Sequence, residues 1–269
     1  MIEIDRKVRK VFVMKEKELE NVLKEHNQEH IFEAYKKLDE KGKEKLIAQI
    51  EKIDWSILAM AGHEELAQER GKLVPLSALE VPEIERNRAK YEQVGLDAIK
   101  AGKVGAVLLA GGQGTRLGFD GPKGKYNIGI TKEMYIFERL IRNLQDVTDK
   151  VGCFVPLYIM TSDKNHNETT AFFEEKDYFG YPKDFVKFFK QEMAPSVDFN
   201  GKLFMEAPDS LSLSPNGNGG WFYSMAVTGV LNDVKVRGVE WLNIFAVDNV
   251  LQRIADPVFV GATLDSGRV

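Results

Sequence analysis

A glycine-rich loop that carries two cations is the stretch of this sequence best suited to chemistry. The run Gly111-Gly-Gln-Gly-Thr-Arg-Leu-Gly118 follows the mostly apolar residues 104–110, and Lys123 comes shortly after it. Backbone N–H groups in such a loop can surround phosphate oxygens, and Arg116 and Lys123 add positive charge. The pattern therefore indicates a phosphate-binding loop. The alternative is an ordinary strand-to-helix turn with surface cations, because glycine and lysine also cluster by chance.

The spacing within this loop does not fit two common nucleotide-binding motifs. A dinucleotide-binding fingerprint needs glycine at its first, third and sixth places, but the sixth place counted from Gly112 is Leu117. A P-loop needs glycine five residues before its Gly-Lys pair, where this chain has Phe119. It also needs Ser or Thr after that pair, where this chain has Tyr126. Dehydrogenase and P-loop readings are therefore weak.

The elements that must position this loop are those of an α/β domain. After residue 102, short apolar runs alternate with helical patterns, which is typical of a parallel sheet flanked by helices. The expected strands are 104–110, 154–160, 185–189 and 241–247, and the expected helices are 131–145, 165–176 and 220–231. Because ligands gather at the carboxyl ends of parallel strands, the residues that follow each strand are the best site candidates.

Candidate side chains follow the other three strands as well. Residues 161–163, Thr-Ser-Asp, are expected to cap the next helix. Gln191 can both donate to and accept from the edge of a uracil, although a surface glutamine is the alternative. Asp248 is a natural Mg²⁺ ligand beside a phosphate loop, because Mg²⁺ prefers one or two carboxylates together with substrate phosphates. Residues 214–220 contain three glycines and form either a plain turn or a second surface of close approach.

Residues 1 to 100 are expected to form an N-terminal helical region, distinct from a nucleotide-binding domain at 101–269. Apolar residues recur there at helical spacing, as in Leu19, Val22 and Leu23. His26-Asn-Gln-Glu-His30 matches an inverted zinc-protease pattern. Its flanks are polar and no third ligand stands out, so we reject a zinc site there.

The composition is that of a globular cytoplasmic protein. The 269 residues carry a net charge of −4 and 43% hydrophobic residues, which gives no sign of a nucleic-acid surface. The single cysteine, Cys153, cannot form an internal disulfide, as suits a reducing compartment. The N-terminus does not read as a signal peptide, and no apolar run is long enough to span a membrane.

Several motifs occur in the same order as in one enzyme family. They are Leu109-Ala-Gly-Gly-Gln-Gly-Thr-Arg-Leu-Gly118, Pro122-Lys-Gly124, Tyr178-Phe-Gly180, Met193-Ala-Pro195, Pro215-Asn-Gly-Asn-Gly-Gly220, Val247-Asp-Asn249 and Ala255-Asp-Pro257. By these residues the chain resembles the UDP-N-acetylglucosamine pyrophosphorylases, which are sugar-1-phosphate uridylyltransferases of the nucleotidyltransferase A type. The similarity covers residues 90–261 and is closer to this group than to the UDP-glucose pyrophosphorylases.

The resemblance implies a Rossmann-like nucleotidyltransferase domain with a mostly parallel sheet and a role for each matching residue. Arg116 and Lys123 would hold the UTP phosphates as catalytic residues, Asn218 would face the sugar, and Asp248 would bind Mg²⁺. The residues implied to bind the nucleotide are Leu109, Gly111, Gly112, Gln191, Pro215 and Gly217. One departure is Asn216, which stands where an aspartate is common.

The implied reaction makes UDP-N-acetylglucosamine and pyrophosphate from UTP and N-acetylglucosamine-1-phosphate. Such enzymes continue well beyond the position of Val269, so the resemblance also implies that the domain lacks its C-terminal part. Two alternatives stay open: a UDP-glucose or UDP-galactose pyrophosphorylase, and an inactive module that only binds UTP.

Overall fold

The described residues, 14–58 and 78–267 of a computed structural model, form two compact units. One unit combines residues 14–58 with 193–215, and the other combines 78–192 with 216–267. This division differs from a boundary at residue 100 in two ways. Helix α5 (Val81–Lys100) belongs to the second unit because it packs on α10 (Pro257–Ser266), and residues 193–215 belong to the first unit because they share its hydrophobic core.

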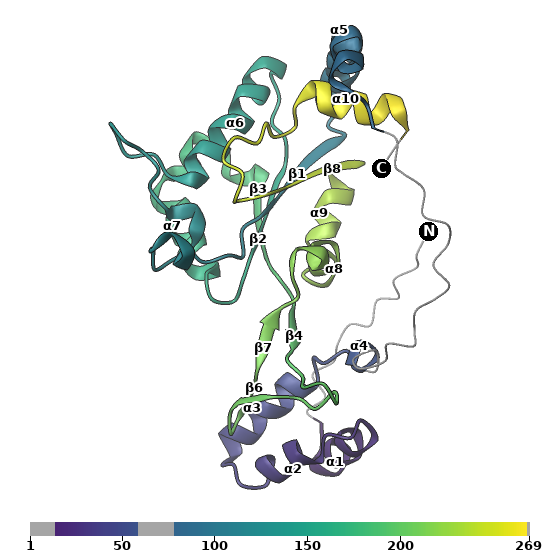
Figure 1. Ribbon diagram of the computed structural model, residues 1–269, viewed down its shortest axis with the longest axis vertical. Coiled ribbons are helices and arrows are strands. Elements are labelled where there is room, and N and C mark those ends of the chain that lie inside the picture. Colours follow the sequence, from purple (N-terminus) through teal and green to yellow (C-terminus); the bar gives the residue numbers. More distant parts are fainter. Residues whose placement is uncertain (1–13, 59–77, 268–269) are drawn as a thin grey trace. The chain divides into compact units, whose positions relative to one another are not determined.

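The second unit is built on a four-stranded parallel sheet with the strand order β3-β2-β1-β8 (Figure 1). Strand β1 (Val104–Leu109) pairs with β2 (Leu157–Thr161) on one side and with β8 (Trp241–Ala246) on the other. Strand β3 (Val186–Lys190) extends the sheet beyond β2. The expected α/β class with a parallel sheet is confirmed, and each expected strand is present within three residues of its expected start.

Strand β1 is buried on both faces, which explains its continuous apolar sequence. Ala106 and Leu108 contribute to one hydrophobic core, together with residues of α6 (Ile136–Val151) and α7 (His166–Glu175). Val107 and Leu109 contribute to another core, with Met225 and Val234 from the opposite face. Figure 1 shows α6 and α7 on one side of the sheet, and α8 (Trp221–Val227) and α9 (Val230–Val236) on the other.

Two expected helices differ from those observed. The helix expected at 220–231 is divided into α8 and α9, because Gly229 adopts a left-handed conformation (φ 80°) that interrupts the regular turns. The helix expected from residue 131 begins at Ile136. The segment before it is held in a loop by Asn127, whose side-chain oxygen accepts hydrogen bonds from the N–H groups of Gly129 and Met134.

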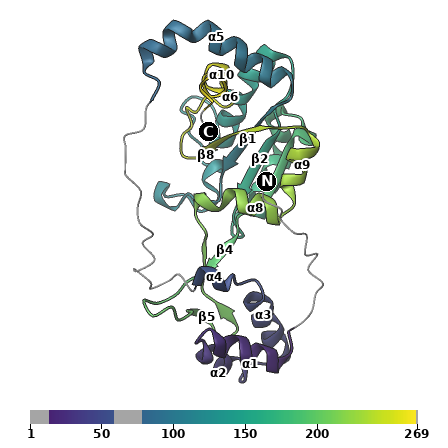
Figure 2. The same ribbon diagram turned by 90° about the vertical axis from the view of Figure 1, so that its right-hand side faces the viewer.

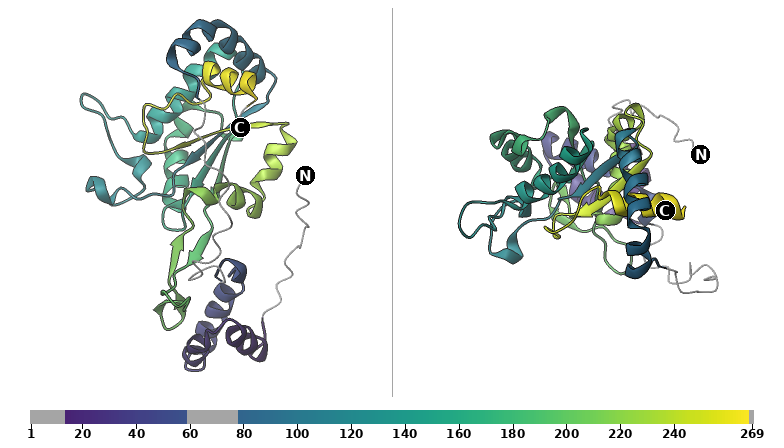
Figure 3. Two further views of the ribbon diagram at one scale, coloured as in Figure 1. Left: turned by 45° about the vertical axis from the view of Figure 1, so that its right-hand side comes forward. Right: turned by 90° about the horizontal axis from the view of Figure 1, so that it is seen from above.

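Helices α5 and α10 cross at close range in every ribbon view (Figures 2 and 3). The crossing occurs where Gly95 of α5 meets the backbone of Pro257, and where Gly261 of α10 meets the backbone of Tyr91. An ideal Cβ on Gly95 would lie 1.9 Å from the carbonyl oxygen of Pro257. The two helices can therefore approach this closely only without side chains at these positions.

The first unit contains the expected helices, and residues 193–215 complete it. Its helices are α1 (Glu16–Glu25), α2 (Glu29–Tyr35), α3 (Glu40–Ile50) and α4 (Trp55–Leu58). Its strands form two antiparallel pairs: β4 (Met193–Pro195) with β7 (Leu213–Pro215), and β5 (Met205–Ala207) with β6 (Ser210–Leu211). From residues 193–215, Leu203 and Leu211 share a hydrophobic core with Leu19, Leu23 and Leu46.

The histidines of the rejected zinc pattern have structural partners in this unit. His26 stacks on Trp55 with ring centroids 4.2 Å apart, and the ring nitrogen Nε2 of His30 lies 2.8 Å from the carbonyl oxygen of Leu203. In the described parts of the chain, no cluster of His, Cys, Asp and Glu has the makings of a multi-ligand metal site. Nor does a helix within residues 14–58 or 78–267 have the length and apolar character needed to cross a bilayer.

Candidate active site

The glycine loop folds back on itself immediately after β1. The N–H of Gly114 donates to the carbonyl of Gly121 at 2.8 Å, and the N–H of Lys123 donates to the carbonyl of Gly112 at 3.2 Å. These bonds bring the beginning and the end of the loop together, so Lys123 lies beside Gly112. Arg116, in a short 3-10 turn (Thr115–Leu117), is exposed and has no ion-pair partner among the residues that the structure describes. It is thus a free cation on the loop.

The loop presents backbone donors that the described residues do not use. Within the described chain, the N–H groups of Gly111, Gly112 and Gln113 donate no hydrogen bond. Consecutive free N–H groups of this kind can bind an anion such as phosphate. The side-chain oxygen Oε1 of Gln113 is also buried without a partner among residues 14–58 and 78–267, and such an atom often marks a place for water or a ligand.

Lys123 and Asp248, which are far apart in the sequence, form an ion pair. Lys123 comes from the loop after β1, and Asp248 from the end of the neighbouring strand β8. The Lys123 side chain is only 12% exposed, whereas that of Asp248 is 62% exposed. An ion pair with one partner in water contributes little to stability. Because it is largely exposed, the Asp248 carboxylate remains accessible to a ligand beside the loop.

Gln191 connects two of the glycine-rich segments. It follows β3 and is 6% exposed, so it is not the surface glutamine that was the alternative interpretation. Its amide nitrogen donates to the carbonyl of Gly217 at 2.7 Å, and its amide oxygen Oε1 would lie 2.9 Å from a Cβ on Gly111. Gly217 has φ 77° and ψ 175°, a conformation essentially restricted to glycine. Gly111, Gln191 and Gly217 therefore form one packed group.

The remaining predicted site residues are less closely joined to this group. Leu109 is the last residue of β1, and its side chain lies in the hydrophobic core. Gly112 is exposed, with open space where a Cβ would be. Asn218 is exposed at the start of a 3-10 turn (Asn218–Gly220) that leads into α8. Pro215 ends strand β7 and belongs to the first unit.

Asn165, which was not among the predicted site residues, is buried and holds the glycine loop in place. Its side chain donates to the carbonyl oxygens of Ala110 (2.9 Å) and Gly112 (3.3 Å) and accepts from the N–H of Ser162 (2.8 Å). The expected capping of α7 by residues 161–163 is wrong. The N-cap is Asn165, and its side chain makes no cap bond because it turns back to the loop. In the sequence, Asn165 is distinguished only as a polar residue that follows a predicted strand.

A second buried asparagine holds the segment after Asp248. Asn143 of α6 is 7% exposed and donates to the carbonyl oxygens of Val250 (3.1 Å) and Gln252 (2.9 Å). In the sequence it lies within an amphipathic helix, and only its position on the buried face distinguishes it. Both loops at the carboxyl ends of β1 and β8 are therefore fixed by buried amides from helices on the same face of the sheet.

His166, the first residue of α7, makes stability depend on pH. Burial lowers its pKa below the ordinary value of 6.5, and the positive charge of Lys190 lowers it further, while Asp163 opposes them. The unfolded chain thus binds a proton more readily than the folded chain. Stability is full above the ordinary pKa and is lost as pH falls from there through the lower pKa of the folded state.

We expect His166→Asn to flatten this pH dependence, because asparagine does not titrate. Urea unfolding of both proteins between pH 7.5 and 5 measures the difference between their slopes. Equal slopes over that interval would show that His166 does not contribute.

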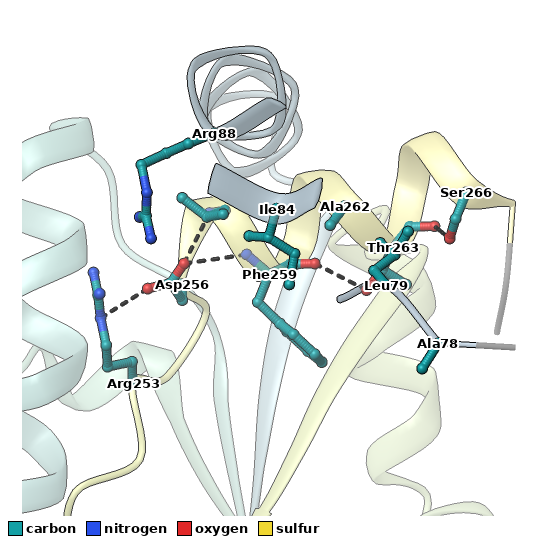
Figure 4. A pocket seen from close by; sticks show the side chains of 11 residues that line it. Ala78, Leu79, Ile84, Arg88, Arg253, Asp256, Phe259, Ala262, Thr263 and Ser266 are labelled. Carbon is teal, nitrogen blue, oxygen red and sulfur yellow. Dashed lines mark hydrogen bonds and ion pairs between the residues drawn. The ribbon is translucent and has the colours of Figure 1, made fainter. Parts of the chain in front are cut away.

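A cavity of about 470 Å³ lies elsewhere, between α5 and α10. Figure 4 shows Phe259 and Ile84 lining it, with Asp256 paired to Arg253 at one end. Asp256 also caps α10 by accepting from the N–H groups of Val258 and Phe259. None of the residues lining this cavity is among the predicted site residues.

Known proteins resemble this chain in both sequence and structure. It is 36% identical over 264 residues to UDP-N-acetylglucosamine diphosphorylase 2 of Arabidopsis thaliana, covering 90% of this chain and 52% of that protein. It is 43% identical over 183 residues to the UDP-N-acetylglucosamine pyrophosphorylase of Saccharomyces cerevisiae, covering 66% and 38%. The chain spans about half the length of the curated relatives that match most of it.

Among solved structures, one similar fold is the uridine diphosphate N-acetylglucosamine pyrophosphorylase of Trypanosoma brucei in complex with an inhibitor. Its TM-score is 0.78 at 28% sequence identity, and the match covers 96% of this chain and 56% of that one. A UDP-glucose pyrophosphorylase variant of Leishmania major, at 15% identity and a TM-score of 0.57, shares the fold alone. The family model described as UTP–glucose-1-phosphate uridylyltransferase matches residues 40–268. The chain therefore belongs to the UTP–glucose-1-phosphate uridylyltransferase family.

Proposed function

We propose that this chain transfers the uridylyl group of UTP to N-acetylglucosamine-1-phosphate, giving UDP-N-acetylglucosamine and pyrophosphate. The observation that carries this proposal is the meeting of a loop with free N–H groups, Lys123 and Asp248 at the ends of neighbouring strands. These are the donors and charges that a nucleoside triphosphate needs. The names of the relatives that match most of the chain favour the N-acetylhexosamine substrate.

In the proposed reaction, a phosphate oxygen of the sugar-1-phosphate attacks the α-phosphorus of UTP. The P–O bond to the β-phosphate breaks, and pyrophosphate leaves with the electron pair. This displacement needs no covalent enzyme intermediate, so the protein contributes positioning and charge neutralisation. Arg116 and Lys123 stabilise the negative charge that grows on the leaving pyrophosphate. The free N–H groups of Gly111–Gln113 supply further donors for the phosphate oxygens.

The donor set at this site suits Mg²⁺. Asp248 offers one largely exposed carboxylate beside the phosphate loop, and Mg²⁺ is usually bound by one or two carboxylates together with substrate phosphates. Asp248 would hold the ion, which would supply Lewis-acid polarisation of the phosphate oxygens. Lys123 contacts the same carboxylate and keeps it beside the loop before substrate binds.

Gln191, Gly111 and Gly217 form the proposed uracil side of the site. The amide oxygen of Gln191 has no hydrogen-bond donor among the residues described here, and it can accept from the N3–H group of a uracil. Gly112, with open space at its Cβ position, allows close approach of the ligand. Leu109 and Pro215 complete the proposed nucleotide contacts, and Asn218 is proposed to face the sugar. The cytoplasm remains the proposed location, as suits a chain with a single free cysteine.

A panel of sugar-1-phosphates, each with UTP and Mg²⁺, tests the proposal through release of pyrophosphate. We expect N-acetylglucosamine-1-phosphate to give the highest kcat/KM. A higher value for glucose-1-phosphate or galactose-1-phosphate would favour the first alternative, which the description of the family model also suggests. A rise in Tm with UTP, without product from any sugar, would identify an inactive UTP-binding module.

A further inference from the structure

We propose that Asn165 is a positioning residue that orients the free N–H groups of the glycine loop toward the phosphates. This proposal rests on the proposed function, because it concerns how the same site binds UTP. The starting observation is an exception to a common pattern. Asn165 is the N-cap of α7, a position where an asparagine side chain usually accepts from the helix backbone, yet its side chain makes no cap bond. The side chain is used elsewhere.

The three hydrogen bonds of this side chain all go to backbone groups of two loops. Its oxygen accepts from the N–H of Ser162, and its nitrogen donates to the carbonyls of Ala110 and Gly112. The residue is 0% exposed, so these bonds are made away from bulk water. One amide group thus holds two alternate carbonyls of the loop.

The geometry of the peptide group links those carbonyls to the free donors. No peptide bond among the described residues is cis, and in a trans peptide the C=O and the following N–H point in opposite directions. The carbonyl of Ala110 shares its peptide group with the N–H of Gly111, and the carbonyl of Gly112 shares its peptide group with the N–H of Gln113. When Asn165 draws both carbonyls toward itself, both N–H groups point away from it.

These two N–H groups are among the three that donate to no described residue. Asn165 therefore keeps them facing the same way without the help of a ligand. Donors arranged in advance bind developing charge more strongly than donors that must reorganise.

Asn165 also reaches the lysine of the site through one shared atom. The carbonyl oxygen of Gly112 accepts both from the Asn165 side chain and from the N–H of Lys123. A shift of Gly112 would therefore displace the backbone that carries Lys123. Asn165 touches no substrate in this scheme and acts through the loop alone.

The test compares Asn165→Ala with a matched variant in the first unit, Gln28→Ala. Gln28 is 3% exposed and makes the same three kinds of bond: its oxygen accepts from the N–H of Leu203, and its nitrogen donates to the carbonyls of His26 and Gly201. Both variants should therefore lower Tm. Asn165→Thr, whose hydroxyl retains one donor, serves if Asn165→Ala does not fold.

We expect Asn165→Ala to raise the Kd for UTP, measured by calorimetry with Mg²⁺, by about tenfold, with a smaller rise in Asn165→Thr. Gln28→Ala should leave that Kd within about twofold of the original. A Kd that is unchanged in Asn165→Ala, or that rises equally in Gln28→Ala, would overturn the proposal.

Amide relaxation of the ligand-free proteins separates this proposal from the proposed function. We expect the NMR order parameters of Gly111 and Gln113 to fall in Asn165→Ala and not in Gln28→Ala. If the original chain binds no UTP, the proposed function fails, and this measurement still decides the role of Asn165. Unchanged order parameters at Gly111 and Gln113 would refute it.

Discussion

Replacing Lys123 with alanine is expected to lower kcat for uridylyl transfer about 100-fold while the protein remains folded. The reason lies in the position of the ammonium group. It is nearly buried at the joined ends of the glycine loop and contacts Asp248, the proposed metal ligand. In the proposed reaction such a cation would stabilise the charge that grows on the leaving pyrophosphate, and water in its place would be a weaker substitute.

Folding should survive this substitution because the carboxylate left behind is largely in water. Asp248 is 62% exposed, so the loss of its partner should change the free energy of unfolding little. The matched control is Lys125→Ala, which removes another lysine of the same turn (Lys123–Lys125) whose ammonium pairs with Glu168 at 2.5 Å. Its kcat should stay within about threefold of the original. Steady-state pyrophosphate release measures both variants, and an equal loss in the two would contradict a specific role for Lys123.

Gly95→Ala is expected to lower the free energy of unfolding by about 3 kcal/mol. Intrinsic helix propensity alone would predict the opposite, since alanine is favoured over glycine by about 1 kcal/mol within a helix. The crossing with α10 decides whether the substitution raises or lowers the free energy of unfolding. A Cβ at Gly95 would meet the carbonyl oxygen of Pro257 at 1.9 Å and its carbonyl carbon at 2.7 Å, and backbone cannot move aside as a flexible side chain can. The two helices would have to separate.

Urea unfolding of Gly95→Ala, compared with Gly219→Ala, measures this effect. Gly219 has open space around its Cβ position and no positive φ, so its substitution should change stability by no more than about 0.5 kcal/mol. If Gly95→Ala were as stable as the original protein, the close approach of α5 and α10 would not be needed for folding.

The strands of the parallel sheet could be predicted because their signal is local. A short apolar run that is buried on both faces shows its nature in its own composition, as β1 does. The ends of the elements were less predictable, since single side-chain hydrogen bonds and backbone conformations decide them. Asn127 delays the start of α6, and Gly229 divides α8 from α9.

Which residues belong to each of the two units also depends on packing between distant parts of the sequence. Residues 193–215 lie between strands β3 and β8 in sequence, yet Leu203 and Leu211 are buried with the helices of the first unit. Helix α5 precedes the sheet and packs on α10 at Gly95 and Gly261. These glycines matter because each lies against the backbone of the other helix. No local pattern contains such information.

By itself, the sequence determined the kind of fold and the residue types that can handle phosphate. The site candidates could be recognised from residue type and from their positions after apolar strands. They are the loop glycines, Arg116, Lys123 and Asp248. Only the tertiary structure decided that Lys123 contacts Asp248, that Gln191 is buried against Gly217, and that Asn165 leaves its own helix uncapped to hold the loop. These relations join residues that are 26 to 125 positions apart, or depend on which way one buried amide turns, and local sequence patterns encode neither.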